Sequence, residues 1–352
     1  MTARVVIAAG GTGGHVFPAL AVANELRRLG AEVRWLGAGG IETQVVPPHG
    51  ILLQTVPFRP PSGILGGLRL LIAVMRARKL LRQHKPSVVL GMGGYAAVPG
   101  ALAGRLLGAP LIVHEQNAIA GRANRLLNKF ARRTLTGFPD SLPKGEWVGN
   151  PVRDSFWHVT PPSPDTNSPL RLLILGGSQG AQALNSIIPQ ALTQVRRDCI
   201  ITHQCGRGRE KSVRDAYAAT GIQAEVTEFI DDVATCMAAA DLVICRAGAA
   251  TLAEATAAGA ALLLVPYPHA ASNHQLANAQ FFKKNGAAEV CEQIALTPAW
   301  LADFLQKTQK STLATLALKA RRLARADATT VVAQCCLHEA GEKNIAETKH
   351  AA

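Results

Sequence analysis

The chain has 352 residues, a length that suits two domains of ordinary size, and 48% of the residues are hydrophobic. No apolar run reaches the roughly 20 residues that a membrane-spanning helix needs, and the chain starts directly with a strand-like segment, so we expect neither a transmembrane helix nor a signal peptide. The seven cysteines include no Cys-x-x-Cys pair, which argues against a disulfide framework and against a zinc site.

The formal net charge of +13 is concentrated in one segment. Between residues 43 and 139 the sequence has 13 Lys or Arg and one acid, Glu115. Such an excess of positive charge in one segment indicates an anionic partner. Nucleic acid, anionic lipid and a phosphorylated substrate are all anionic partners of this kind. Only two aromatic residues, Phe58 and Tyr95, lie between residues 43 and 129, so the stacking surfaces that nucleic acids use are scarce.

In the first half, short apolar runs bounded by glycine alternate with stretches of helical periodicity. The predicted strands are residues 4–9, 33–37, 51–56, 87–92, 110–114 and 133–137. The predicted helices lie near residues 16–29, 66–84, 96–107 and 120–131.

A proline-rich polar stretch, residues 161–169, is interpreted as a linker. After it the alternation starts again, with helices between predicted strands at 170–175, 199–204, 224–229, 241–245 and 261–265. Strands that alternate with helices favour parallel, doubly wound sheets. We therefore predict an α/β fold of two Rossmann-like domains, 1–153 and 164–326, whose parallel sheets face a cleft.

The last part of the chain is expected to leave the second domain. A basic, alanine-rich helix is predicted near residues 312–325. Residues 327–340 are expected to pack back on the first domain, and residues 341–352 to form a disordered tail.

Each half opens with a predicted strand that runs into a glycine-rich turn and then into a helix. The first turn is residues 10–14 and the second is residues 176–180, while a third, residues 91–95, follows another strand of the first half. Glycine lets backbone N–H groups approach an anion, and the amino end of a helix adds a favourable dipole. Three such turns indicate phosphate binding, although tight strand-to-helix packing would also explain any single one.

These turns do not match the dinucleotide fingerprint. Val16 stands where the third glycine belongs, and the predicted strand 33–37 ends without the acid that would hold an adenosine ribose. The sequence also lacks the G-x-x-x-x-G-K-[ST] string of a P-loop. Both absences disfavour a dehydrogenase and an NTPase.

A further cluster, residues 246–254, follows the predicted strand 241–245. Gly248 can turn the chain into the next helix, and Glu254 would lie on the first turns of that helix, where a carboxylate can accept both hydroxyls of a ribose. The alternative explanation of Glu254 is an acid that interacts only with the helix dipole. Downstream, Gln275 follows the end of another predicted strand, where polar side chains are placed to contact a ligand.

Together these motifs resemble those of the MurG family, the peptidoglycan N-acetylglucosaminyltransferases that convert lipid I to lipid II. The matching segments, in chain order, are residues 10–18 (GGTGGHVFP), 91–95 (GMGGY), 114–117 (HEQN), 148–153 (VGNPVR), 176–180 (GGSQG) and 246–254 with Gln275. The resemblance implies a GT-B fold and an inverting transfer, without metal or cofactor, of N-acetylglucosamine from UDP-N-acetylglucosamine to the 4-hydroxyl of N-acetylmuramic acid in undecaprenyl-linked lipid I.

The resemblance also implies roles by position, with the donor held by the second half and the acceptor by the first. Ile230 would hold uracil through its backbone, Glu254 would bind the ribose, and Gln275 would contact the sugar. The implied donor-binding positions are Thr12, Gly13, Gly14, Asn117, Arg153, Ser178, Ile230, Ala249, Ala250, Thr251, Leu252, Ala253, Glu254 and Gln275. The positions proposed for the acceptor diphosphate are Gly13, Gly14, Gly93, Gly94 and Tyr95.

Two residues are candidates for the catalytic base, which has to take the proton of the acceptor hydroxyl. His15 lies at a glycine-rich helix start and matches the family residue proposed near the reacting centre; the alternative is a His that only caps the helix or binds phosphate. Glu115 is the lone acid of the basic segment, at the end of a predicted strand. Its alternative role is an internal partner that positions the loop. No Asp-x-Asp pair stands where a metal would bridge a diphosphate, and Asp231 and Asp232 are read as a turn or a helix cap.

Residues 64–82 combine apolar and basic side chains with helical periodicity. We expect Leu70, Val74, Ala77 and Leu81 to form a buried stripe. The opposite side is predicted to face a membrane through Leu65, Leu68, Ile72, Met75, Arg69, Arg76 and Lys79. Apolar side chains beside basic ones suit the headgroup boundary of an anionic leaflet. A packed helix with a solvated basic edge is the alternative.

The sequence thus predicts a peripheral enzyme at the cytoplasmic face of the bacterial inner membrane. Its expected partners are UDP-N-acetylglucosamine, lipid I, the anionic membrane surface and other proteins of cell-wall synthesis, but not nucleic acid. The alternatives are another GT-B UDP-sugar enzyme, such as a glycolipid synthase or a UDP-N-acetylglucosamine epimerase, and a non-catalytic membrane scaffold. An epimerase needs no membrane face, and the presence of His15, Glu254 and Gln275 argues against a scaffold.

Overall fold

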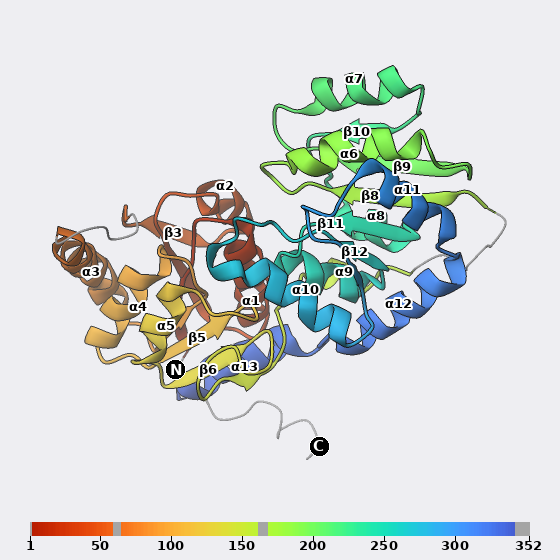
Figure 1. The fold of residues 1–352 in the computed structure, drawn as a ribbon. Coiled ribbons are helices and arrows are strands. Elements are labelled where there is room, and N and C mark those ends of the chain that lie inside the picture. The colour runs from red at the N-terminus through yellow and green to blue at the C-terminus, as the bar shows by residue number, and fades with distance from the viewer. Residues whose placement is uncertain (1, 59–64, 161–167, 342–352) are drawn as a thin grey trace, which may run out of the picture. The chain divides into compact units, whose positions relative to one another are not determined.

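The computed structural model describes residues 2–58, 65–160 and 168–341, which Figure 1 draws as coloured ribbon. The chain divides into two compact units. The first unit combines Met1–Arg153 with Arg325–Ala352, and the second unit is Asp154–Ala324. Residues 161–167 of the predicted linker 161–169 and residues 342–352 of the predicted tail 341–352 lie outside the described residues.

Seven parallel strands form the sheet of the first unit, in the order β3-β2-β1-β4-β5-β6-β7. The strands are β1 (Arg4–Ala8), β2 (Glu32–Gly37), β3 (Leu52–Thr55), β4 (Val88–Gly91), β5 (Leu111–Glu115), β6 (Arg133–Thr136) and β7 (Glu146–Trp147). The helices are α1 (Gly13–Arg28), α2 (Glu42–Val45), α3 (Leu65–His84), α4 (Ala97–Leu106), α5 (Arg122–Asn128) and α13 (Ala328–Glu339), with a 3-10 turn η1 (Pro47–His49).

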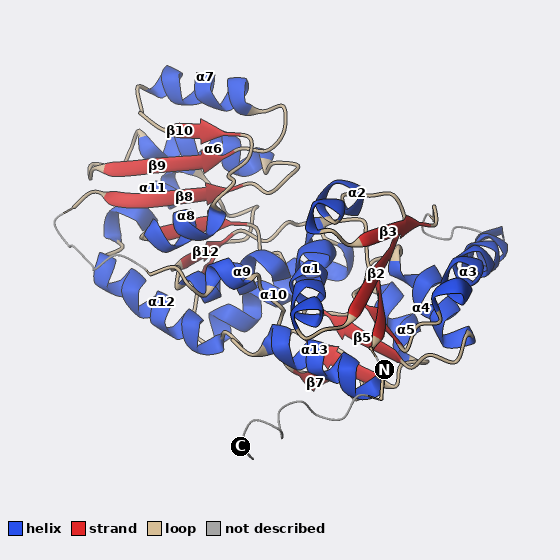
Figure 2. Cartoon of the chain, turned by 180° about the vertical axis from the view of Figure 1, so that it is seen from behind, coloured by secondary structure: helices blue, strands red, loops and turns tan. Residues whose placement is uncertain are grey.

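Side chains of β1 alternate between the two cores of this unit, as the period of a strand requires. Val5 and Ile7 pack with α1 and with Val332 of α13, whereas Val6 and Ala8 pack with α3, α4 and α5. Figure 2 shows the same arrangement, with α1 and α13 on one face of the sheet and α3, α4 and α5 on the other. A sheet covered on both faces explains why its central strands β1, β4 and β5 are buried along nearly their whole length.

Six parallel strands form the sheet of the second unit, in the order β10-β9-β8-β11-β12-β13. The strands are β8 (Leu170–Leu175), β9 (Cys199–Gln204), β10 (Glu225–Thr227), β11 (Leu242–Cys245), β12 (Leu262–Leu264) and β13 (Glu289–Val290). The helices are α6 (Gln182–Leu192), α7 (Glu210–Thr220), α8 (Val233–Ala239), α9 (Ala249–Ala258), α10 (His274–Lys284), α11 (Pro298–Lys307) and α12 (Lys310–Leu323), with 3-10 turns η2 (Asp154–Phe156) and η3 (Ala271–Asn273).

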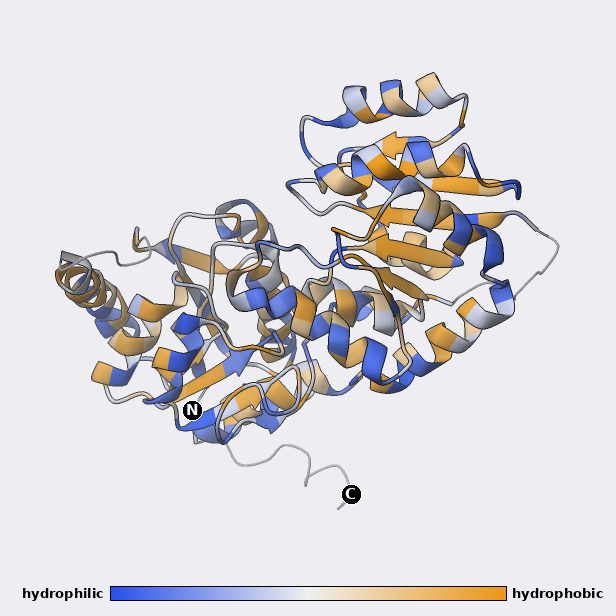
Figure 3. Cartoon of the chain, viewed as in Figure 1, coloured by the Kyte–Doolittle hydropathy of each residue, from blue (hydrophilic) through white to orange (hydrophobic). Residues whose placement is uncertain are grey.

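The buried core on one face of the second sheet consists mostly of aliphatic side chains. Leu172 and Ile174 of β8 pack with Leu184 and Ile188 of α6, and α11 covers the same face. In Figure 3 the central strands of this sheet are mostly in the hydrophobic colour. The opposite face carries α8 and α9, where Asp232 caps α8 by accepting a hydrogen bond from the backbone N–H of Thr235 at 3.1 Å. The prediction that this acid caps a helix is confirmed.

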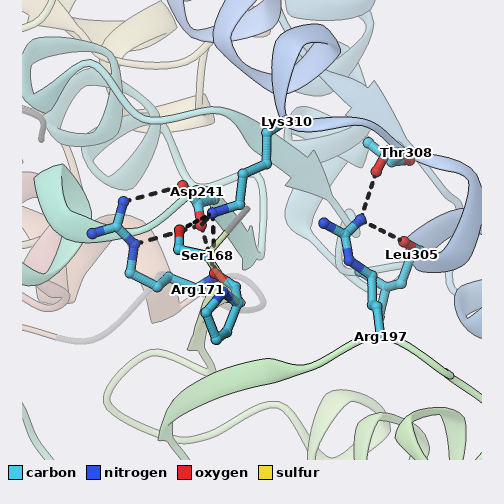
Figure 4. Close-up of polar contacts among 8 residues, drawn as sticks. Ser168, Arg171, Arg197, Asp241, Leu305, Thr308 and Lys310 are labelled. Carbon is cyan, nitrogen blue, oxygen red and sulfur yellow. Dashed lines mark hydrogen bonds and ion pairs between the residues drawn. The ribbon is translucent and has the colours of Figure 1, made fainter. Parts of the chain in front are cut away.

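A buried lysine fastens the start of α12 to the second sheet. Lys310 is 7% exposed and lies 3.1 Å from a carboxylate oxygen of Asp241, which also pairs with Arg171 at the start of β8. The ammonium of Lys310 also donates to Ser168 Oγ at 2.8 Å and to the carbonyl of Pro169 at 3.0 Å (Figure 4). Because all three of its protons are used, the buried charge is compensated.

The predicted doubly wound α/β fold is confirmed, and each predicted strand is present with its ends within two residues. Two strands were not predicted: β7 and β13 have two residues each and form only by pairing with β6 and β12. The first helix begins at Gly13 instead of residue 16, because Thr12 takes the extended conformation of an N-cap and its carbonyl accepts from His15 N and Val16 N. His15 therefore lies in the first turn of α1.

Candidate functional site

In each unit the predicted site residues follow the carboxyl ends of neighbouring parallel strands. In the first sheet the strand order reverses at β1 and β4, and the turns after these two strands are the two glycine-rich turns of this unit. In the second sheet it reverses at β8 and β11, whose following turns carry Ser178 and Gly248. Open α/β sheets bind ligands at such switch points. Each unit therefore has one natural binding edge, at which the predicted residues gather.

The first glycine-rich turn is held by a buried carboxylate. Glu42, which begins α2, is fully buried and accepts hydrogen bonds from the backbone N–H groups of Gly11 (3.1 Å), Ala38 (2.8 Å), Gly39 (3.0 Å) and Gly40 (2.9 Å). It thus joins the turn after β1 to the turn after β2. Gly11 has a φ of +94°, a conformation that favours glycine.

Side chains are excluded around this carboxylate. A Cβ at Gly10 or at Gly37 would lie within 2.8 Å of Glu42 side-chain atoms. Burial opposes ionisation of Glu42, but the hydrogen bonds from backbone N–H groups outweigh it and lower the pKa of this carboxyl. The residue is absent from the predicted site. A sequence signal for it is an acid that follows the pair Gly39 and Gly40 after one intervening residue, at the point where the predicted second strand has ended.

His15 is enclosed by the third glycine-rich turn, residues 91–95, which follows β4. A Cβ at Gly93 would lie 3.1 Å from His15 Nδ1, and a Cβ at Gly94 would lie 3.2 Å from His15 Cδ2 and 2.8 Å from the carbonyl oxygen of Gly10. Both glycines have positive φ, +87° and +72°. His15 Nδ1 lies 3.0 Å from Gln116 Oε1. The structure thus brings together His15, the turn after β4 and the loop after β5.

Glu115, the other candidate base, has its carboxylate fully engaged. It is 1% exposed. Oε1 accepts from the backbone N–H of Asn117 at 2.9 Å and from its side-chain amide at 3.2 Å. Oε2 accepts from the backbone N–H of Gly121 at 3.1 Å and from Asn124 Nδ2 at 2.9 Å. Four donors, from the loop that follows β5 and from the start of α5, surround this group, so its geometry is that of a carboxylate that positions this loop.

Three more predicted positions lie at the same edge of the first unit. Thr12 is the N-cap of α1, although its side chain makes no capping hydrogen bond. Arg153 places its guanidinium 5.0 Å from the ring centroid of Phe17, on the second turn of α1. Tyr95 is half-buried directly after the glycine pair. A guanidinium beside a helix start is suited to an anion that binds there.

In the second unit the glycine-rich turn is held by a neutral side chain, Gln204 at the end of β9. Its amide oxygen accepts from the backbone N–H of Gly177 at 2.9 Å, and its amide nitrogen donates to the carbonyls of Gly177 (3.1 Å) and Glu228 (2.8 Å). Gln204 therefore ties the turn that carries exposed Ser178 to the loop that carries half-buried Ile230. The sequence prediction did not include Gln204.

The remaining donor candidates start α9 and α10. Gly248 is the N-cap of α9, the run from Ala249 to Ala253 forms its first turns, and Glu254 lies in its second turn, half-buried. Buried Asn278 of α10 holds the start of α9 by donating to the carbonyl of Ala247 at 3.0 Å. Gln275 uses its amide oxygen to accept from the backbone N–H of Tyr267 at 3.0 Å. Asn278 is a positioning residue that the sequence did not indicate.

The predicted split between the two sides of α3 is confirmed. Val74, Ala77 and Leu81 are at most 5% exposed and Leu70 is partly buried, whereas the exposed fractions of Leu68, Ile72 and Met75 are 54%, 44% and 49%. The basic side chains of α3 that belong to the predicted membrane face, Arg69, Arg76 and Lys79, are all exposed. Leu71, 57% exposed, extends this face and was not predicted. The side chain of Leu65 lies outside the described residues.

In residues 2–58, 65–160 and 168–341, no helix is both long and apolar enough to cross a membrane. Within the same ranges, no group of three or more His, Cys, Asp and Glu side chains is arranged to hold a metal ion.

The chain is similar to known proteins along nearly its whole length. The glycosyltransferase family 28 N-terminal domain matches residues 5–136, and the C-terminal domain of the same family matches residues 171–335. Curated relatives share the name UDP-N-acetylglucosamine–N-acetylmuramyl-(pentapeptide) pyrophosphoryl-undecaprenol N-acetylglucosamine transferase. The relative from Albidiferax ferrireducens is 48% identical over 94% of this chain and 90% of its own length. The relative from Ralstonia nicotianae is 47% identical over 96% of this chain and 99% of its own length.

Solved structures agree with these relatives. The crystal structure of Acinetobacter baumannii MurG has a TM-score of 0.82 and 37% identity, and the match covers 96% of this chain and 99% of that chain. The glycotransferase of kitacinnamycin has a TM-score of 0.71 at 16% identity. The latter likeness concerns the fold alone.

The contacts of Glu42 generate a test of its role in stability. We expect Glu42→Gln to lower the free energy of unfolding by about 1.5–3 kcal/mol at neutral pH, because an amide leaves buried N–H groups without a full set of acceptors. The pKa of Glu42 is lowered in the folded state, so its contribution is complete above the ordinary value of 4.5 and is lost as the pH falls through the folded pKa. The difference between the two proteins should therefore shrink in acid.

Chemical denaturation at neutral and acid pH measures this difference. The matched control is Glu146→Gln, an exposed carboxylate of the same unit that pairs with Arg133, and its effect should stay below about 1 kcal/mol. Equal losses in both variants, or a Glu42→Gln effect that persists unchanged in acid, would contradict the assignment.

Proposed function

The chain belongs to the MurG family of N-acetylglucosaminyltransferases, within glycosyltransferase family 28, and we propose that its two units divide the work: the second binds the donor, and the first binds the acceptor and supplies the base. The protein transfers N-acetylglucosamine from UDP-N-acetylglucosamine to lipid I, which forms lipid II. The contrast between His15 and Glu115 carries the proposal, because only one of these two groups has an atom left for the acceptor hydroxyl.

The donor site that we propose lies at the carboxyl edge of the second sheet. Glu254 accepts the two ribose hydroxyls, and the backbone of Ile230 holds the uracil. The diphosphate binds where the turn with Ser178 and the start of α9 present backbone N–H groups, supported by the dipole of α9. Gln275, whose amide oxygen is held by the backbone of Tyr267, directs its amide nitrogen to the sugar.

The acceptor site that we propose lies at the corresponding edge of the first sheet. Gly13 and Gly14 at the start of α1, with Gly93, Gly94 and Tyr95 after β4, bind the diphosphate of the lipid-linked acceptor. Glycine at these positions lets a phosphate approach the backbone closely. Thr12, Asn117 and Arg153 of this unit complete the donor contacts.

In the reaction that we propose, His15 removes the proton of the acceptor 4-hydroxyl. The oxygen of that hydroxyl forms a bond to the anomeric carbon of N-acetylglucosamine, and the bond from that carbon to the UDP oxygen breaks. UDP leaves with the electron pair, and attack from the opposite face inverts the anomeric centre. Glu115 keeps the loop after β5 in shape and takes no proton, since its four lone-pair sites accept hydrogen bonds from that loop and from Asn124 of α5.

We propose that the protein is peripheral at the cytoplasmic face of the inner membrane, where lipid I is exposed. The exposed side of α3 supports this placement, because it presents Leu68, Leu71, Ile72 and Met75 beside basic side chains. Apolar side chains enter the headgroup boundary, and each basic residue near an anionic surface contributes roughly 1 kcal/mol. Other proteins of cell-wall synthesis are proposed as further partners on the basis of this location.

The division between the two candidate bases is tested by comparing His15→Gln with Glu115→Gln in transfer of labelled N-acetylglucosamine to a lipid I analogue. His15→Gln should lower kcat by about 100-fold to 10,000-fold, the range for loss of a general base, and should leave the affinity for UDP and the thermal unfolding midpoint unchanged. Glu115→Gln should lower the unfolding midpoint, because it removes an acceptor from a buried loop. The proposal is wrong if Glu115→Gln loses kcat at full stability while His15→Gln stays active.

The ribose assignment is tested by calorimetry with UDP. Glu254→Ala should weaken binding by about 1.5–3 kcal/mol, because two hydroxyls lose a charged acceptor. The control is Glu292→Ala, which removes an exposed acid of the same unit outside the proposed site. If UDP binds both variants as tightly as the wild type, Glu254 does not hold the ribose.

The membrane face is tested by co-sedimentation with anionic vesicles. A variant with Leu68→Ser, Ile72→Ser, Arg76→Gln and Lys79→Gln should bind them less, while UDP affinity and turnover of a short-chain, water-soluble acceptor are retained. Added salt should weaken only the electrostatic part, since exposed charges are screened within about 8 Å at physiological ionic strength.

A matched control makes the same four kinds of change on the second unit. Ile200 and Ile294 are exposed apolar residues, and Lys211 and Arg214 are exposed cations of α7. Their substitution by Ser and Gln should leave vesicle binding unchanged. Equal loss in both quadruple variants would show that binding follows overall charge and hydrophobicity, not the α3 face.

A further inference from the structure

A buried chain of hydrogen bonds connects the backbone of the first unit to His15. His114 Nε2 lies 2.9 Å from the carbonyl oxygen of Gly149, and His114 Nδ1 lies 3.1 Å from Gln116 Nε2. Gln116 Oε1 lies 3.0 Å from His15 Nδ1. His114 and Gln116 are at most 1% exposed, so this chain is closed to water along most of its length.

The direction of the first link is fixed by chemistry. A backbone carbonyl only accepts hydrogen bonds, so His114 Nε2 carries a proton and donates it to Gly149. Burial lowers the pKa of His114 to about 4, which keeps this ring neutral. A neutral imidazole has one proton, and His114 Nδ1 is therefore an acceptor.

The second link follows from the first. Gln116 Nε2 donates to His114 Nδ1 and also lies 3.2 Å from the backbone carbonyl of His114, which again only accepts. Two independent acceptors thus place the amide nitrogen on this side. The Gln116 backbone is held as well, because Asn150 Nδ2 donates to its carbonyl at 2.9 Å. The amide oxygen of Gln116 then has to face His15.

We propose that His114 and Gln116 are positioning residues that fix His15 as the tautomer with its proton on Nδ1 and a lone pair on Nε2. The inference rests on the proposed role of His15 as the base. An amide oxygen only accepts, so His15 Nδ1 has to donate to it. Among the described residues, none forms a hydrogen bond with His15 Nε2. The glycine-rich turn after β4 holds the same ring from another side, since a Cβ at Gly93 or Gly94 would meet it.

The arrangement suits a base in both of its protonation states. When Nε2 takes the proton of the acceptor hydroxyl, Nδ1–H keeps its bond to Gln116 Oε1, so the hydrogen bond does not have to be remade during the step. With the opposite tautomer, Nε2–H would face the acceptor hydroxyl and could not take its proton. In serine proteases, a wrong imidazole tautomer costs about four orders of magnitude in kcat.

The tautomer can be observed directly by nitrogen NMR of the full-length protein labelled at histidine, at about pH 8, where an ordinary imidazole is neutral. The signal of His15 is identified by its loss in His15→Gln. We expect a protonated Nδ1 and an unprotonated Nε2 in the wild type. A protonated Nε2 in wild-type His15 overturns the inference without any variant, and it does so whether or not His15 is the base.

The variant Gln116→Met removes both links while nearly conserving side-chain volume. We expect the Nδ1–H signal of His15 to lose its dominance and kcat to fall at least about tenfold, with the KM for UDP-N-acetylglucosamine unchanged. The matched control is His84→Met, which replaces another buried polar side chain of the first unit, 4% exposed, outside the chain of hydrogen bonds. Its tautomer signal for His15 and its kcat should match the wild type.

The outcomes separate the two proposals. If Gln116→Met shifts the tautomer of His15 and lowers kcat, the role of His15 as the base and the positioning role of Gln116 are both supported. If the tautomer shifts and kcat does not change, the chain of hydrogen bonds exists but His15 is not the base. If Gln116→Met and His84→Met lose kcat equally with the His15 tautomer unchanged, Gln116 is merely structural and the inference is wrong.

Discussion

The candidate site of the first unit depends on the burial of one carboxylate. Glu42 collects four backbone N–H groups from the turns after β1 and β2, so these turns cannot move independently. A buried charge is tolerated only while its donors are in place. The glycines around it leave no room for a side chain. The shape of the turn that leads into α1, and with it the position of His15, therefore follows from a residue that contacts no proposed ligand.

The second unit meets the same requirement with a neutral group. Gln204 hydrogen-bonds to both the N–H and the carbonyl of Gly177 and also to the carbonyl of Glu228. One amide therefore fixes the turn that carries Ser178 and the loop that carries Ile230. An amide adds no negative charge beside a diphosphate, whereas a carboxylate would repel it. Asn278 holds the start of α9 in a similar way. Side-chain amides thus organise the edge that we propose for the donor, and a carboxylate organises the edge that we propose for the acceptor.

Two acids in the first unit show that the chemistry of a carboxyl group is decided by its donors. Glu42 and Glu115 are both buried and both accept from several loop N–H groups. Neither has a free oxygen to offer a substrate, and the imidazole of His15 remains as the group with an available atom. The exposed cations of α3 are separate from these buried groups, and we propose that they face an anionic membrane.

The sequence by itself determined the fold class, every strand except β7 and β13, the three glycine-rich turns and the two sides of α3, because each of these follows from local periodicity or local glycine content. Only the tertiary structure decided the rest. The strands β7 and β13 exist through pairing with β6 and β12. Glu42 and Gln204 act on turns 31 and 27 residues away in the chain. The difference between a base and a loop-holding acid depends on which donors surround the group, and folding alone brings these donors together.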